Sequence, residues 1–64
     1  MTRDALIREL RKYARLKDLA FEVFENNGKG SHYRIKLGEQ FTTVKSGELK
    51  PGYVKLIKKQ LGVI

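Results

Sequence analysis

The spacing of the apolar residues changes twice along the chain, and no other feature constrains the fold as closely. From residue 3 to about residue 16, apolar side chains recur at the spacing of one helix face, as at Leu6, Leu10 and Ala14. From residue 19 to residue 44 the spacing is two, which is typical of half-buried strands. The helical spacing returns after Pro51. The sequence therefore predicts a helix, a set of strands and a second helix.

Two turns divide the middle of the chain into three strands. The first strand is expected at residues 19–24, the second at 32–37 and the third at 40–44. The turn at residues 26–30 contains an Asn-Gly pair, the strongest short signal for a hairpin. A tight Gly-Glu turn at residues 38–39 separates the second strand from the third. The pattern is that of an antiparallel sheet.

Both predicted helices and the sheet are apolar on one side only. The economical packing places both helices on one face of the sheet and leaves the other face in solvent. The expected fold class is α+β in the order α-β-β-β-α, with a three-stranded antiparallel sheet. Because 64 residues support one hydrophobic core, residues 1–64 are expected to form a single domain. The polar residues 45–50 are expected to be a loop, and Pro51 suits the first turn of a helix.

The chain carries a large excess of positive charge. Fourteen Lys and Arg residues against seven Asp and Glu residues give a net charge of +7, which attracts polyanions, nucleic acid first. The same excess fits a protein that charge merely keeps soluble, or a subunit that meets an acidic partner. Without cysteine, the chain forms neither a disulfide nor a thiolate zinc site. No apolar run reaches the ~20 residues of a membrane span or resembles a signal peptide, so we expect a soluble, cytoplasmic protein.

The only histidine, His32, lies in the sequence Gly-Lys-Gly-Ser-His-Tyr. Alternation along the second strand turns His32, Arg34 and Lys36 toward the same open face of the sheet. A metal site is not expected, because no second His, Cys or pair of carboxylates lies at ligand spacing. A protease-like triad is not expected either, because Ser31 faces the other side of the strand. An isolated exposed histidine is usually inert, so the neighbouring cations decide the interpretation.

General acid–base catalysis on a phosphodiester fits this group of side chains better. RNA carries its own nucleophile, the 2′-hydroxyl, so an enzyme needs a proton-exchanging group and positive charge near the phosphate. His32 is a candidate for the first role, and Arg34 and Lys36 are candidates for the second. The backbone N–H groups of residues 28–31 are a candidate phosphate cradle, or simply a hairpin that requires glycine.

The segments GKGSHYRI, at residues 28–35, and LKPGYVKLIKKQLGVI, at residues 49–64, resemble the HicA toxins of bacterial toxin–antitoxin systems. Gly30, Ser31 and His32 match the Gly-Ser-His motif that precedes a strand in that family, and the second segment is similar to its final helix. The resemblance covers nearly the whole chain. A difference lies at residues 44–47, which read Val-Lys-Ser-Gly where many relatives have a Pro-His-like element.

The resemblance implies a fold like that of double-stranded-RNA-binding domains, ribosome-independent mRNA cleavage that depends on His32, and a HicB-type antitoxin as partner. We expect an endoribonuclease without metal or cofactor, whose phosphate contacts come from Lys29, Arg34, Lys36 and Lys45. With one histidine in the chain, a Lys, an Arg or water has to complement His32. The alternative is a non-catalytic double-stranded-RNA-binding module of the same fold. A third possibility is a structural subunit that binds an acidic partner.

Overall fold

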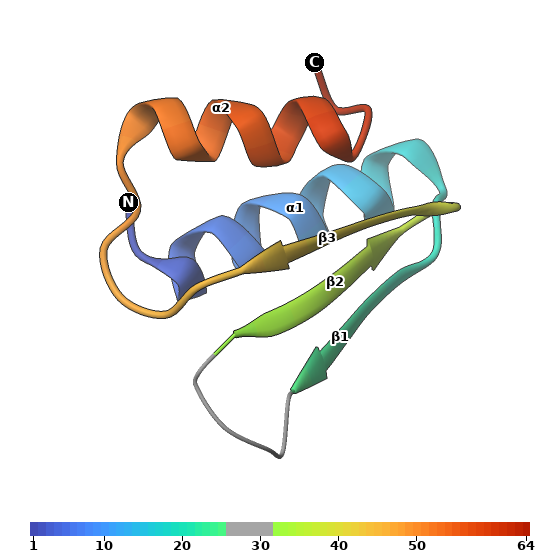
Figure 1. The fold of residues 1–64 in the computed structure, drawn as a ribbon. Helices are drawn as coiled ribbons and strands as arrows, with labels where there is room; N and C mark the ends of the chain where they lie inside the picture. Colours follow the sequence, from blue (N-terminus) through green and yellow to red (C-terminus); the bar gives the residue numbers. More distant parts are fainter. Residues whose placement is uncertain (26–31) are drawn as a thin grey trace.

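A computed structural model describes residues 1–25 and 32–64 of the chain. Within these residues a helix, three strands and a helix follow one another, as Figure 1 shows. They are α1 (Arg3–Lys17), β1 (Phe21–Glu25), β2 (Tyr33–Leu37), β3 (Gln40–Val44) and α2 (Pro51–Gln60). The predicted α+β class and the α-β-β-β-α order are confirmed. Neither helix in this part of the chain is long and apolar enough to cross a membrane.

Helix α1 begins and ends at residues suited to helix termini. The Oγ1 atom of Thr2 accepts a hydrogen bond from the backbone N–H of Ala5 at 3.2 Å, which satisfies one of the N–H groups that a first turn leaves unpaired. At the other end Asp18 has a left-handed backbone with φ of 57°, and its N–H returns to the carbonyl groups of the last turn. The helix therefore stops at Lys17, and the chain turns toward the sheet.

The sheet is antiparallel, with the strand order β1-β2-β3. Both outer strands pair with the whole length of β2, which is therefore the central strand. Gly38 lies in the turn between β2 and β3 with φ of 62°, a left-handed conformation that glycine adopts without steric cost. Its N–H donates a 2.8 Å hydrogen bond to the carbonyl oxygen of Ala20, which joins this turn to the segment before β1.

The hydrophobic core lies between the two helices and one face of the sheet. In Figure 1, β3 crosses in front of α1, and α2 runs above both. The largest fully buried side chains come from both helices, from β2 and β3 and from the loop before α2: Leu6, Leu10, Ile35, Leu37, Val44, Leu49 and Ile57. Side chains of β1 pack partly buried against this cluster. The predicted placement of both helices on one face agrees with this arrangement, and the opposite face of the sheet is open.

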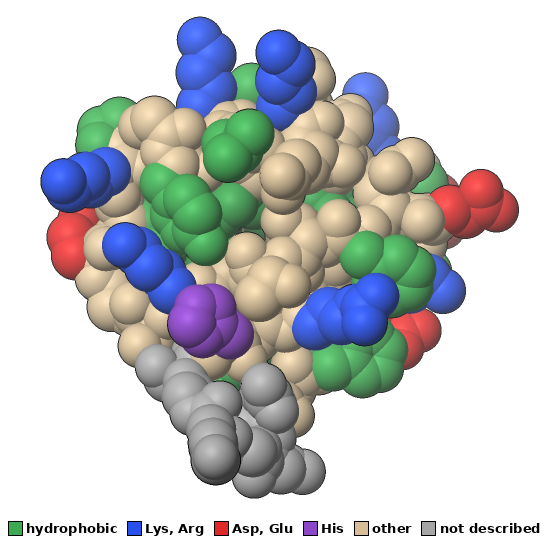
Figure 2. Space-filling model, viewed as in Figure 1, with side chains coloured by type: hydrophobic (Ala, Val, Ile, Leu, Met, Phe, Trp, Pro, Cys, Tyr) green, Lys and Arg blue, Asp and Glu red, His purple; other side chains and the backbone are tan. Residues whose placement is uncertain are grey.

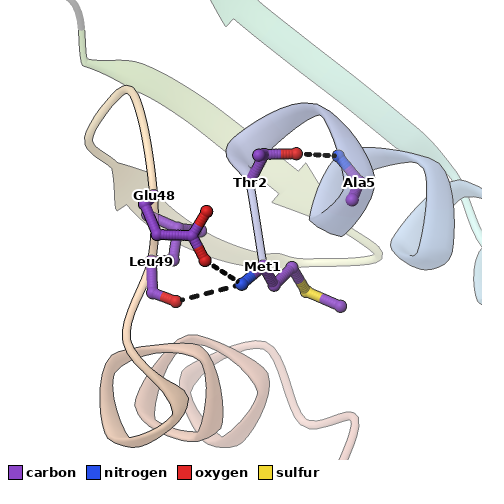
Figure 3. A network of polar contacts seen from close by, with 5 residues as sticks. All are labelled: Met1, Thr2, Ala5, Glu48 and Leu49. Carbon is purple, nitrogen blue, oxygen red and sulfur yellow. Dashed lines mark hydrogen bonds and ion pairs between the residues drawn. The ribbon is translucent and has the colours of Figure 1, made fainter.

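The loop between β3 and α2 contributes to the core, which its polar composition did not predict. Leu49 is 1% exposed, although the residues around it are polar. Residues 48–49 are held against the beginning of the chain, since the N–H of Leu49 donates to the carbonyl oxygen of Met1 at 2.6 Å. Figure 3 shows the amino group of Met1 directed toward the carboxylate of Glu48 and the carbonyl oxygen of Leu49. These contacts hold the backbone of Leu49 beside Met1, and its side chain belongs to the hydrophobic core.

Polar contacts join α2 to its two neighbours. The ammonium group of Lys58 lies 2.9 Å from a carboxylate oxygen of Glu9 on α1. Lys58 is half-buried, and its ion pair with Glu9 joins α2 to α1. On the other side, the hydroxyl of Thr42 donates a 2.6 Å hydrogen bond to Oε1 of Gln60. Thr42 is buried, so this bond satisfies a polar group that would otherwise be costly to bury.

The first strand starts later than the sequence pattern predicts. We expected residues 19–24, whereas β1 covers Phe21–Glu25. The reason is the end of α1, where the N–H of Leu19 donates a 2.8 Å hydrogen bond to the carbonyl oxygen of Ala14. Leu19 therefore belongs to the closing turn of the helix, and its side chain is exposed. The prediction that the first strand begins at Leu19 was wrong.

Candidate functional site

The open face of the sheet carries outward-facing side chains from each of its strands. Side chains alternate along a strand, and directly paired residues share a face, so the register arranges these side chains in two rows. One row contains Phe24, Arg34 and Thr43, and the other contains Glu22, Lys36 and Phe41. Lys36 is half-buried, and the other members are exposed. The two cations lie on the central strand.

His32 lies directly before β2 and is exposed. It lines a surface pocket together with Phe24, Glu25, Arg34 and Thr43. Figure 2 looks onto this face and shows the histidine with Lys and Arg side chains on either side of it. The structure therefore places His32 and Arg34 together on the open face, as the strand alternation predicts.

The other two predicted phosphate contacts in this part of the chain, Lys36 and Lys45, do not line that pocket. Lys36 belongs to the second row, with its ammonium nitrogen 5.6 Å from the centroid of the Phe41 ring. Lys45 follows β3, and its ammonium nitrogen lies 5.4 Å from the centroid of the Tyr53 ring at the start of α2. The backbone N–H of Lys45 also donates to the hydroxyl of Tyr53 at 3.4 Å. Lys45 is thus held toward α2 rather than toward the centre of the open face.

Several predicted features lie outside the described residues. They are the hairpin at residues 26–30, the phosphate contact Lys29, the side-chain direction of Ser31 and the backbone cradle of residues 28–31. The described part of the candidate site is therefore the strand face with His32 at its edge.

Two exposed phenylalanines, Phe24 and Phe41, are part of this face and were not predicted as site residues. Phe24 is 45% exposed and Phe41 is 46% exposed. The alternation of β1 already places Phe24 on the outer side, opposite to Val23. For Phe41 the signal is misleading, because a large apolar residue in a strand suggests the core, whereas Thr42 and Val44 are the buried residues of β3. Glu25 and Thr43, which line the pocket with His32, were not predicted either.

The aromatic and charged side chains of this face contact one another. The guanidinium carbon of Arg34 lies 4.6 Å from the centroid of the Phe41 ring, within the range of a cation–π interaction. Arg34 and Lys36 therefore both approach the same ring, which limits the directions that these long side chains take. The arrangement combines an imidazole, a guanidinium group that lies against an aromatic ring, and a second aromatic ring on one open surface.

The donor groups of the described residues do not assemble into a metal site. Across residues 1–25 and 32–64, His, Cys, Asp and Glu side chains do not gather in groups of three or more that could hold an ion.

Comparisons of the chain with protein-family models, with curated proteins and with solved structures find no match.

Proposed function

We propose that this chain is a metal-independent endoribonuclease of the HicA type, which cleaves mRNA as the toxin of a toxin–antitoxin pair. The observation that carries the proposal is the pocket on the open sheet face, where the exposed His32 lies with Arg34 and Thr43. An imidazole exchanges protons near neutral pH, and a guanidinium group binds two phosphate oxygens at once. The net charge of +7 attracts RNA to the surface that holds these groups.

The proposed reaction uses the 2′-hydroxyl of the RNA as nucleophile. His32 takes the hydroxyl proton while the 2′-oxygen forms a bond to the adjacent phosphorus. The bond between phosphorus and the 5′-oxygen breaks, and that oxygen takes a proton from water or from a nearby Lys or Arg. The products are a 2′,3′-cyclic phosphate and a 5′-hydroxyl end. Arg34 binds the phosphate oxygens, where negative charge grows in the transition state.

The similarity to HicA toxins supports the same interpretation. It rests on the Gly-Ser-His motif at residues 30–32 and on the closing segment at residues 49–64. From this similarity, the partner is a HicB-type antitoxin that covers the open face and represses its own operon, and the pair acts in the cytoplasm. A gene for a HicB-like protein beside the gene for this chain would support the proposal.

The test compares the wild-type protein with His32→Ala. We expect the wild type to cleave RNA in the presence of EDTA and to stop growth when it is expressed, and we expect the variant to do neither. Because His32 is exposed, its removal leaves the fold intact, and a circular dichroism spectrum that overlays on that of the wild type provides the control. Equal cleavage by both proteins, or loss of wild-type cleavage in EDTA, would contradict the proposal.

Measuring RNA binding by the same two proteins distinguishes the proposed nuclease from an RNA-binding module without catalysis. If neither protein cleaves RNA, while both bind it with an affinity that falls steeply as salt increases, the chain is an RNA-binding module. If neither protein binds RNA, the positive charge serves an acidic protein partner instead.

A further inference from the structure

We infer that the open sheet face binds single-stranded RNA by stacking two unpaired bases on Phe24 and Phe41. The inference names the substrate class and the base-binding residues of the site, and it rests on the proposed function for its account of cleavage. It is carried by the exposure of the two rings, by their positions in the sheet and by the cations between them.

The exposure of the two rings is the first observation. Both phenylalanines occupy outward positions of the sheet and leave nearly half of their surface in solvent. Burying either ring in a complex would remove apolar surface from water, which is favourable. Proteins that bind single-stranded RNA use rings in this position, since each base has a flat face that stacks on an aromatic side chain whatever its sequence.

The register places the rings on opposite sides of β2. Phe24 on β1 is paired with Arg34, and Phe41 on β3 is paired with Lys36, two residues further along β2. From strand spacing and rise, the two Cα atoms are about 12 Å apart. Neighbouring bases in a duplex strand are separated by only about 3.4 Å, so bases on both rings belong to a strand that is unstacked and spread out. In a duplex the bases are paired inside the helix, so they are not accessible for stacking on Phe24 and Phe41.

The positive charges lie where the backbone of such a strand would pass. Arg34 and Lys36 are on the central strand, between the two rings. Their cationic groups are 4.6 Å and 5.6 Å from the centroid of the Phe41 ring, so each charge stays close to a stacking surface. Phosphates that connect the two stacked bases would therefore meet these cations. A stacked base also meets the guanidinium plane of Arg34, which itself stacks on bases.

The position of Phe24 connects base binding with the proposed cleavage. Phe24 lines the same pocket as His32 and Arg34. A base stacked on Phe24 brings its own ribose and the following phosphate to the imidazole and the guanidinium. The bond that is cut is therefore expected next to the nucleotide that stacks on Phe24.

The test measures binding of a fluorescein-labelled 12-nucleotide RNA, single-stranded or annealed to its complement, by fluorescence anisotropy. All proteins carry His32→Ala, so that the RNA stays intact during the measurement. We expect Phe24→Ala and Phe41→Ala each to weaken single-strand binding by roughly 5- to 150-fold, the range that loss of one stacked base gives. Phe24→Tyr and Phe41→Tyr keep a stacking ring and are expected to bind within about twofold of the parent.

Leu56→Ala is the matched control, because Leu56 is a 49% exposed apolar side chain that lies on α2 instead of the sheet. We expect it to bind like the parent, and we expect duplex RNA to bind more weakly than the single strand and to be insensitive to the Phe changes. If the Ala variants bind the single strand as tightly as the parent, the rings do not stack on bases and the inference is overturned. An equal loss for single strand and duplex, or a loss that the Tyr variants share, also overturns it.

These outcomes are independent of cleavage. If the wild type fails to cut RNA but Phe-dependent binding of the single strand is found, the proposed function fails and the single-strand inference stands. If His32→Ala abolishes cleavage while the Phe variants bind the single strand normally, the proposed function stands and the single-strand inference fails.

Discussion

The guanidinium carbon of Arg34 lies 4.6 Å from the centroid of the Phe41 ring, so a cation of the central strand is held against an aromatic side chain of the neighbouring strand. The charge and the planar shape of the Arg34 guanidinium group should contribute separately to RNA binding. We expect Arg34→Ala to weaken RNA binding and to reduce the slope of log affinity against log salt by about 0.7, the value for one phosphate contact of a single strand. The measurement is a salt titration of RNA binding.

Arg34→Lys, compared with Arg34→Ala, separates the effect of the charge from the effect of the planar guanidinium group. Lysine keeps the positive charge but loses the plane that stacks and the fork that binds two phosphate oxygens. We expect a salt slope like that of the wild type with a lower affinity at every salt concentration. If Arg34→Ala leaves the salt slope unchanged, Arg34 does not contact phosphate.

The burial of Leu49 predicts a large effect on stability from a loop position. Leu49 is 1% exposed, and truncation to Ala in such a site costs about 2–5 kcal/mol. A chain of this length has a total free energy of unfolding of only about 3–10 kcal/mol, so Leu49→Ala is expected to lose a large fraction of the stability of the protein. Urea denaturation followed by circular dichroism measures the change, with Leu56→Ala as an exposed control. A loss below about 0.5 kcal/mol for Leu49→Ala would show that the loop does not anchor in the core.

Two glycines are expected to respond to the same substitution with opposite signs. Gly38→Ala should destabilise the protein by about 1–2 kcal/mol, because φ of 62° brings an added Cβ close to the following carbonyl oxygen. The added Cβ would lie 3.8 Å from Leu19, an ordinary contact, so the cost comes from the backbone. Gly52→Ala, in the first turn of α2 with open space around it, should stabilise the protein by about 0.4–1 kcal/mol.

Thermal or urea unfolding of the two glycine variants checks both signs in one experiment. Equal effects at Gly38 and Gly52 would contradict the left-handed turn between β2 and β3.

The sequence pattern was sufficient for the fold where apolar spacing is regular. The period of α1 and the alternation of β2 predict the order of elements and the outward direction of His32 and Arg34, because both depend only on local geometry. The burial of Leu49 is an example that apolar spacing does not predict. A single apolar residue in a polar loop has no periodic neighbours, and its burial depends on contacts with the beginning of the chain, which are distant in sequence.

Phe41 shows a second limit, which affects the site. Its strand contains two apolar residues, Phe41 and Val44, and they point to opposite faces of the sheet. Apolar character alone therefore does not identify the buried face. The pairing with β2 and the packing against α2 decide that Thr42 and Val44 face the core, with the hydroxyl of Thr42 bonded to Gln60. The position of the Phe41 ring on the open face follows from this tertiary packing, so the sequence of the strand alone does not predict it.

The most direct test of the central claim is a single-turnover cleavage assay with His32→Ala in EDTA, on an RNA that the wild type cuts. Lys59→Ala, which removes an exposed charge from α2, is the matched control. We expect the control to cleave at the wild-type rate and His32→Ala to be slower by about 10²- to 10⁴-fold, the usual contribution of a general acid or base. We also expect the wild type to leave the RNA intact when the ribose at the cut site lacks its 2′-hydroxyl. Cleavage by His32→Ala at the wild-type rate would contradict the claim that His32 is the catalytic residue.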